Sequence, residues 1–211
     1  GNASEVNGRL EDGLVVSGTH LNIQNNLLHD GWSYDSHPDA IVVQGDGDRN
    51  GNHTSNVVVQ QNVIYNFTQG IYFDAIHNSL DGPNAIINNV VYETSSFRYG
   101  GVSAKMNCLV IDGESLTGPA WPISVTIANN TLDCRQLQAY VLRGAASGSN
   151  ISFKNNLFIR PSFTAIYIAS TSGVTIDYSY YSDSTSTPLK WGSTPYSLPA
   201  FTGAGLGEAH A

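Results

Sequence analysis

VVVQQNVIYN, the stretch at residues 57–66, recurs along the chain and decides its fold. Its further copies are LNIQNNLLHD (21–30), NAIINNVVYE (84–93), VTIANNTLDC (125–134), ISFKNNLFIR (151–160) and a degenerate VTIDYSYYSD (174–183). The third and eighth positions of every copy are apolar, and the sixth position is Asn in all copies except the last, where it is Ser179. Self-similarity of this kind is the signature of a solenoid, in which each repeat packs on its neighbours.

A second repeated strand lies between these copies. It reads GLVVS (13–17), AIVVQ (40–44), GIYFD (70–74), CLVID (108–112), AYVLR (139–143) and AIYIA (165–169). Its second and fourth positions are apolar, which predicts that they face the core while the third and fifth positions face outward. The spacing between copies varies, so the connecting loops are expected to differ in length.

One strand, a variable loop, a second strand, a tight Asn-containing bend and a third strand make one coil. The sequence therefore predicts an all-β fold, a right-handed parallel β-helix of about six coils with an Asn ladder at the short turn. Asn suits this bend because it tolerates a left-handed backbone, and because its amide can bond the Asn of the next coil.

Two regions follow from the extent of the repeat. Residues 1–183 are predicted to form the β-helix, and residues 184–211, rich in Ser, Thr, Pro and Gly, are predicted to form a cap or a tail. Trp191 and Phe201 are the candidate apolar lids for the last coil. No amphipathic capping helix precedes the first coil, so upstream sequence or a partner is expected to cover it, and self-association through uncapped ends is a further expectation.

The inward aliphatic columns and the Asn column resemble those of the pectate-lyase-like right-handed β-helix superfamily, over residues 13 to about 183. HPDAIVVQ (37–44) also resembles the H-x-D-G-I-Q phrase of secreted carbohydrate-active β-helix proteins, with Ala40 where Gly is usual. The sequence contains no full catalytic signature of pectate lyases or polygalacturonases. The resemblance therefore implies the fold and a polysaccharide partner, and it leaves the reaction open.

Composition narrows the class of protein. The net charge of −8 disfavours nucleic acid as a partner, because little in the chain would neutralise a run of phosphates. No apolar stretch approaches 18 residues, so membrane insertion is not expected. A surface rich in Ser, Thr, Asn and Gly suggests an extracellular protein, secreted or exposed at a cell surface. Cys108 and Cys134 are expected either to form a disulfide or to be two buried thiols.

An Asp- and Asn-rich loop follows the strand at residues 40–44. It contains Asp46, Asp48, Asn50 and Asn52, which match the first half of a calcium-binding loop. The bidentate Glu expected later in such a loop is replaced by Val57, so a further ligand would come from elsewhere, for example Asp81. The loop therefore predicts either a calcium site or a solvated turn, and no cofactor other than calcium is expected.

The last outward position of the first strand gives the candidate catalytic column. It carries Asp74, Asp112 and Arg143 on consecutive coils, and parallel stacking would place the two aspartates about 5 Å apart at their backbones. Like charges that close raise one pKa, although Arg143 and Asp112 could equally form a structural ion pair. Lys105 is the fourth candidate catalytic residue. The candidate substrate-binding residues are Tyr72, Arg98, Tyr167 and His77.

Three functions are compatible with this pattern. The first is a lyase acting on an acidic polysaccharide, in which Lys105 removes a proton while Arg98, Arg143 and calcium neutralise the uronate. The second is a glycoside hydrolase that uses Asp74 and Asp112, whose spacing suits a retaining pair. The third is a module that binds glycan or assembles without catalysis, such as an adhesin, a tailspike-like protein or a filament. The sequence favours the first.

Overall fold

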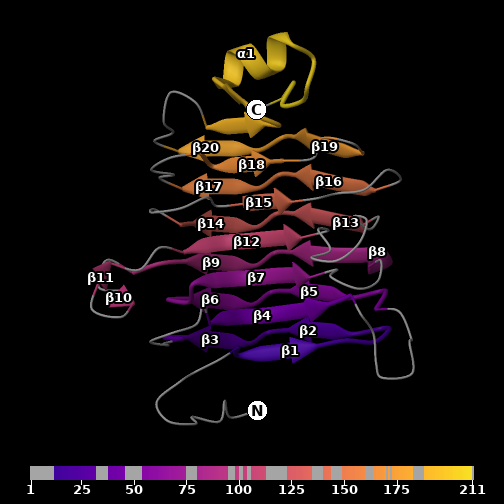
Figure 1. Ribbon diagram of the computed structural model, residues 1–211, viewed down its shortest axis with the longest axis vertical. Helices are drawn as coiled ribbons and strands as arrows, with labels where there is room; N and C mark the ends of the chain where they lie inside the picture. The colour runs from indigo at the N-terminus through magenta and orange to yellow at the C-terminus, as the bar shows by residue number, and fades with distance from the viewer. Residues whose placement is uncertain are drawn as a thin grey trace.

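The computed structural model is all-β apart from one short helix (Figure 1). It describes residues 12–31, 38–45, 54–74, 80–94, 98–99, 102–103, 106–112, 123–134, 140–143, 149–159, 164–169, 171, 173–182 and 188–210. For residues 80–82, 98–99, 102–103 and 140–143 only the backbone is described. Within these residues no helix is long and apolar enough to cross a membrane.

Three sheets contain nearly all of the strands. Sheet I consists of β1 (Leu14–Val16), β4 (Asp39–Gln44), β7 (Gln69–Asp74), β12 (Asn107–Asp112), β15 (Tyr140–Arg143), β18 (Ile166–Ile168), β21 (Leu189–Trp191) and β22 (Thr194–Tyr196). Sheet II consists of β2 (Asn22–Gln24), β5 (Val58–Gln60), β8 (Leu80–Ile87), β13 (Ile123–Ala128), β16 (Asn150–Lys154) and β19 (Val174–Asp177). Sheet III consists of β3 (Leu27–His29), β6 (Val63–Tyr65), β9 (Val90–Tyr92), β14 (Thr131–Asp133), β17 (Leu157–Ile159) and β20 (Tyr180–Ser182).

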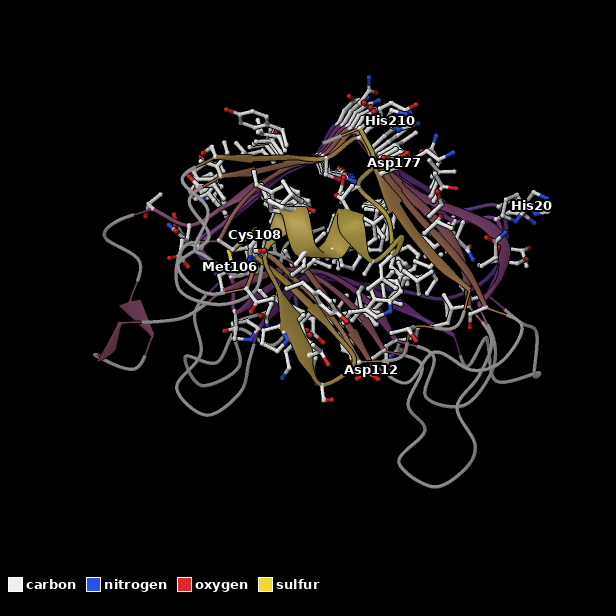
Figure 2. The ribbon with its side chains drawn as sticks, turned by 90° about the horizontal axis from the view of Figure 1, so that it is seen from above. His20, Met106, Cys108, Asp112, Asp177 and His210 are labelled. Atoms are coloured by element: carbon white, nitrogen blue, oxygen red, sulfur yellow. A yellow bond between two sulfur atoms is a disulfide. The ribbon has the colours of Figure 1, made fainter. Side chains whose placement is uncertain are left out.

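The chain enters sheets I, II and III in turn, and neighbouring strands within each sheet are parallel except for β21 and β22. A separate antiparallel ribbon is formed by β10 (Arg98–Tyr99) and β11 (Val102–Ser103). Corresponding residues of successive repeat copies pair in register, for example Leu28 with Ile64 and Ile64 with Val91. Seen from above, the sheets enclose the apolar core (Figure 2). This arrangement is compatible with a solenoid.

A small residue begins every copy of the first strand, for a steric reason that the repeat pattern alone does not reveal. A Cβ added to Gly70 would collide with the carbonyl oxygen of Cys108 and with the side chain of Val91. Sheets I and III thus approach closely at this corner. The equivalent positions Ala40 and Cys108 are fully buried in the same core.

The predicted Asn ladder is present at the bend between sheets II and III. Asn62, Asn89, Asn130 and Asn156 are each 1% exposed. The backbone N–H and the Nδ2 of each of the first three donate to the Oδ1 of the next, as Asn62 does to Asn89 at 3.0 Å in both cases. Each Nδ2 also donates to a backbone carbonyl of the preceding coil, such as that of Ile23 at 2.9 Å from Asn62.

One expectation about the ladder is wrong. The left-handed residue of each bend is not the ladder Asn but the residue before it. These residues, with φ between 55° and 60°, are Asn25, Gln61, Asn88, Asn129, Asn155 and Tyr178. The ladder position is therefore selected by hydrogen bonding alone, while the left-handed position accepts Gln and Tyr as well as Asn.

The C-terminal residues close one end of the stack. Helix α1 (Leu198–Gly203) lies over the interior in Figure 2, and its Phe201 is fully buried. Trp191 packs against Phe201 with ring centroids 5.4 Å apart. Glu208, 2% exposed, ends the Asn ladder: its carboxylate accepts the N–H of Ser179 at 3.1 Å and the hydroxyl of Tyr181 at 2.6 Å.

The two cysteines form a disulfide. Cys108 at β12 and Cys134 after β14 have Cα atoms 5.7 Å apart and are both fully buried. The bond therefore ties sheet I to the end of a sheet III strand inside the core, and it excludes the alternative of two free thiols.

We expect Asn89→Ala to lower the free energy of unfolding by about 3 kcal/mol or more, because it leaves buried donors and acceptors of Asn62, Asn130 and Val59 without partners. Urea denaturation followed by circular dichroism measures this. The matched control is Asn88→Gly, at the exposed left-handed position next to it, which should change stability by less than about 1 kcal/mol. Equal effects of the two substitutions would contradict the role of the ladder.

We expect the double variant Cys108→Ala/Cys134→Ala to lose about 3.5 kcal/mol, because the bond closes a loop between residues 26 apart and so restricts the unfolded chain. Guanidinium denaturation of the variant and of the reduced wild-type protein measures this loss. A variant as stable as the oxidised protein would show that the bond adds nothing.

Candidate functional site

The candidate site is the outer side of sheet I. Asp74 pairs in register with Asp112, and Asp112 pairs in register with Arg143, so the predicted column is present on three consecutive strands. Adjacent parallel strands place these Cα atoms about 5 Å apart. Asp74 and Asp112 are each only 7% exposed, and Asp112 lies at the end of its strand in Figure 2.

Two residues on the outer side of sheet I are shielded from solvent, which the alternation of the strands did not predict. Val42 and Val110 were expected to face outward, and they lie outside the apolar core cluster, yet they are 4% and 0% exposed. The equivalent Val15 on the edge strand β1 is 47% exposed. The central strands β4 and β12 are therefore buried on both faces at these positions.

The two tyrosines of the outer column have different surroundings. The Tyr72 hydroxyl lies 3.4 Å from Asp112 Oδ2, to which it donates a long hydrogen bond. Tyr167 instead has the Lys190 ammonium 4.4 Å from its ring centre, a cation–π contact between residues paired in register. One face of the Tyr167 ring is therefore occupied, whereas Tyr72 contacts a candidate catalytic group.

Asp39 is a further candidate that reasoning from the repeat missed. It opens β4, is 2% exposed, and its backbone N–H donates to Asp12 Oδ1 at 3.1 Å. Burial, together with the nearby charges of Asp12 and Asp74, raises the pKa of Asp39 to about 8. The available signal was the phrase HPDAIVVQ, in which Asp39 is the acidic residue.

Asp39 belongs to a row of polar side chains at the start of the sheet I strands. It pairs in register with Gln69, which pairs with Asn107 on the next strand. Gln69 and Asn107 are each 9% exposed, and their side-chain oxygens accept no hydrogen bond within the part of the chain that the structure describes. Buried amides in this state are suited to binding hydroxyl groups.

Several predicted site residues lie outside the described residues. These are Lys105, His77, Asp46, Asp48, Asn50 and Asn52. Arg98 lies in β10 and Arg143 in β15, and only their backbones are described. Asp81, expected in a loop, instead lies within strand β8. Among the described side chains, no group of three or more His, Cys, Asp and Glu is arranged to hold a metal ion.

Comparisons with models of protein families, with curated proteins and with solved structures found no match. The functional argument therefore depends on the residues of sheet I.

The raised pKa of Asp39 predicts how stability depends on pH. Between about pH 4 and about pH 8 the folded protein keeps the proton and the unfolded chain loses it, so stability falls as pH rises through this range. The upper limit is about 1.4 kcal/mol for each pH unit. Asp39→Asn, which cannot ionise, should match the wild type near pH 4 and be more stable near pH 8. Urea denaturation at several pH values tests this, and parallel curves for the two proteins would contradict it.

Proposed function

We propose that the three sheets are the faces of a right-handed parallel β-helix of six coils, of the kind that the pectate-lyase-like superfamily contains. The support is the order of the strands, which enter sheets I, II and III in turn, together with the Asn ladder at the bend between sheets II and III. In such a solenoid, the outer side of one sheet presents equivalent residues at a regular spacing to an extended ligand.

For the chemistry, we propose a glycoside hydrolase. The observation that carries this proposal is the burial of Asp39, which, with the nearby charges of Asp12 and Asp74, keeps its carboxyl group protonated at neutral pH. A protonated carboxyl group beside ionised ones is the combination that glycoside hydrolysis needs.

The proposed roles follow from these surroundings. Asp39 donates its proton to the oxygen of the leaving sugar. Asp12, whose carboxylate accepts the backbone N–H of Asp39 at 3.1 Å, attacks the anomeric carbon or activates a water molecule. The negative charge of Asp74 helps to hold the proton on Asp39 until the bond breaks. Gln69 and Asn107 bind sugar hydroxyls.

The charges favour a neutral polysaccharide. The chain carries a net charge of −8, and the described acidic groups of sheet I would repel a polyuronate. The lyase acting on an acidic polysaccharide, which the sequence favours, needs Lys105, the side chains of Arg98 and Arg143, and calcium at Asp46 and Asp48. Those groups lie beyond the described side chains, and the lyase remains the second proposal.

We also propose that the protein works outside the cell. The disulfide between Cys108 and Cys134 supports this, because such bonds persist in oxidising compartments and are rare in the cytosol.

The test is an assay of reducing-end release on a panel of neutral glycans and polyuronates. We expect release from a neutral glycan, with activity falling above about pH 8 as Asp39 ionises. Asp39→Asn and Asp12→Asn should each lower the rate by about 100-fold or more. Asp177→Asn is the matched control, because Asp177 lies in sheet II and pairs with His210, and it should leave the rate unchanged.

Other results of the assay have defined meanings. Calcium-dependent absorbance of a new double bond, abolished by EDTA, would replace the hydrolase with the lyase. Absence of product on every glycan would leave a module that binds glycan or assembles without catalysis.

A further inference from the structure

The outer side of sheet III carries an exposed apolar column. The first residue of each strand in this sheet pairs in register with the first residue of its neighbour. Four of these residues are large, apolar and between 37% and 64% exposed, namely Leu27, Val63, Val90 and Tyr180. Three of the four lie on consecutive strands, and a contiguous row of exposed apolar side chains calls for an explanation.

One strand interrupts this column with a hydroxyl group. The first residue of β14 is Thr131, which pairs in register with Val90 and Leu157. It completes Asn129-Asn130-Thr131, an N-x-T acceptor sequence for an N-linked glycan. Three other bends carry the same pair of asparagines, but there the third residue is Leu or Val (25–27, 88–90 and 155–157). Among these four bends, the acceptor sequence therefore occurs only where Thr replaces an apolar residue of the column.

The structure makes Asn129 accessible to modification. It occupies the left-handed position of the bend between sheets II and III, with φ 57°, and its side chain is exposed. Asn130, the ladder residue, is buried between Asn129 and the partly exposed Thr131. The asparagine and the hydroxyl that an acceptor site requires thus lie on the same outer side of the sheet.

The acceptor sequence at Asn66 provides an internal contrast. Asn66 is 6% exposed, and its Nδ2 donates to Asp30 Oδ1 at 2.7 Å. Its Oδ1 accepts the backbone N–H and the hydroxyl of Thr94 at 2.9 and 3.0 Å. A sugar attached to this amide would break these bonds and would not fit in the buried corner. The fold therefore separates a usable acceptor sequence from an unusable one.

The remaining acceptor sequences do not involve the apolar column. Asn150 is exposed at the start of β16 on sheet II, where it pairs in register with Ser124. A glycan at that position would cover polar surface. Asn2 and Asn52 lie outside the described residues.

We propose that Asn129 is an acceptor for an N-linked glycan whose first sugars cover the apolar column of sheet III. This inference rests on the proposed extracellular location, because such glycans are added in the secretory pathway. A glycan is bulky and solubilising, which is the property that an exposed apolar row lacks. The glycan would stand at the bend between sheets II and III, so it would leave the candidate site on sheet I open.

The transfer reaction uses an oligosaccharide carried on a polyprenyl diphosphate. The Nδ2 of Asn129 attacks the anomeric carbon of the first sugar. A bond forms between nitrogen and carbon as the bond from that carbon to the diphosphate oxygen breaks. The amide gives one proton to a base of the transferring enzyme, and the polyprenyl diphosphate leaves with the bonding electron pair.

Peptide mass spectrometry of the full chain, secreted from eukaryotic cells, tests the proposal. Enzymatic release of N-linked glycans in heavy-oxygen water converts each modified Asn to labelled Asp and shifts the mass of its peptide. We expect this shift at Asn129 and none at Asn66. Thr131→Val, which introduces the residue found at Val63 and Val90, should abolish the shift while Asn129 is still present.

Two results would overturn the proposal. One is a shift at Asn129 that persists in Thr131→Val. The other is a secreted, disulfide-bonded protein with an unmodified Asn129, which would leave the proposed location intact and refute the glycan alone. Neither result depends on whether the protein hydrolyses a polysaccharide, so failure of the proposed hydrolase is distinguishable from failure of this inference.

A second variant tests whether the geometry of the bend is sufficient. Leu157→Thr completes the same acceptor sequence at Asn155, the left-handed residue of the next bend, with φ 55°. We expect a new mass shift at Asn155 in addition to the one at Asn129. If Asn155 stays unmodified in the secreted variant, exposure at these bends does not make an acceptor, and the argument for Asn129 fails.

Removal of the glycan from the folded protein tests the covering of the column. Binding of a fluorescent dye that reports exposed apolar surface should increase after removal. Asn129→Gln, which introduces the residue found at Gln61 in the second copy, should bind the dye equally well without enzymatic treatment. Dye binding that is the same with and without the glycan would overturn the covering role.

Discussion

The Asn ladder is the interaction on which the rest of the structure depends. Asn62, Asn89 and Asn130 each accept two hydrogen bonds from the preceding coil and donate to the Asn of the next, so these buried side chains are satisfied when consecutive coils are in register. A shift of one residue would leave these donors and acceptors without partners inside the core, and would move the apolar columns to the outside. The carboxylate of Glu208 accepts the backbone N–H of Ser179, the last residue of the ladder, which explains why a carboxylate is buried at that end of the stack.

Register transmits the effect of the ladder to the candidate site. Because coils are aligned at the bend, the sheet I strands are aligned as well, and Asp74 comes to lie beside Asp112 although 38 residues separate them. The same alignment places Asp39 in a row with Gln69 and Asn107. Burial then separates the roles of chemically identical groups, since it keeps Asp39 protonated. The proposed hydrolase thus needs a rigid stack more than a particular loop.

The sequence could predict what the repeat itself encodes. Inward columns such as Ile64 and Val91 follow from the period-two alternation of the strands. The ladder follows from an Asn that recurs at the same position of each bend. The shielding of Val110 and Asp112 could not be predicted, because period-two alternation places both residues on the outer side of the strand, where exposure is expected. Asp39 was missed because it precedes the repeated strand pattern, which starts at Ala40. The left-handed backbone was predicted at the ladder Asn, one position too late. The preference of left-handed positions for Asn is misleading here, because Gln61 and Tyr178 also adopt this conformation.

The central claim is that sheet I holds a protonated carboxyl group at neutral pH. Carbon-13 NMR of protein labelled at its Asp side chains, titrated with pH and assigned with the Asp39→Asn variant, measures this directly. The account predicts that the Asp39 carboxyl carbon titrates near pH 8. Titration near pH 4, the value of an exposed aspartate, would contradict it and would remove the general acid from the proposed mechanism.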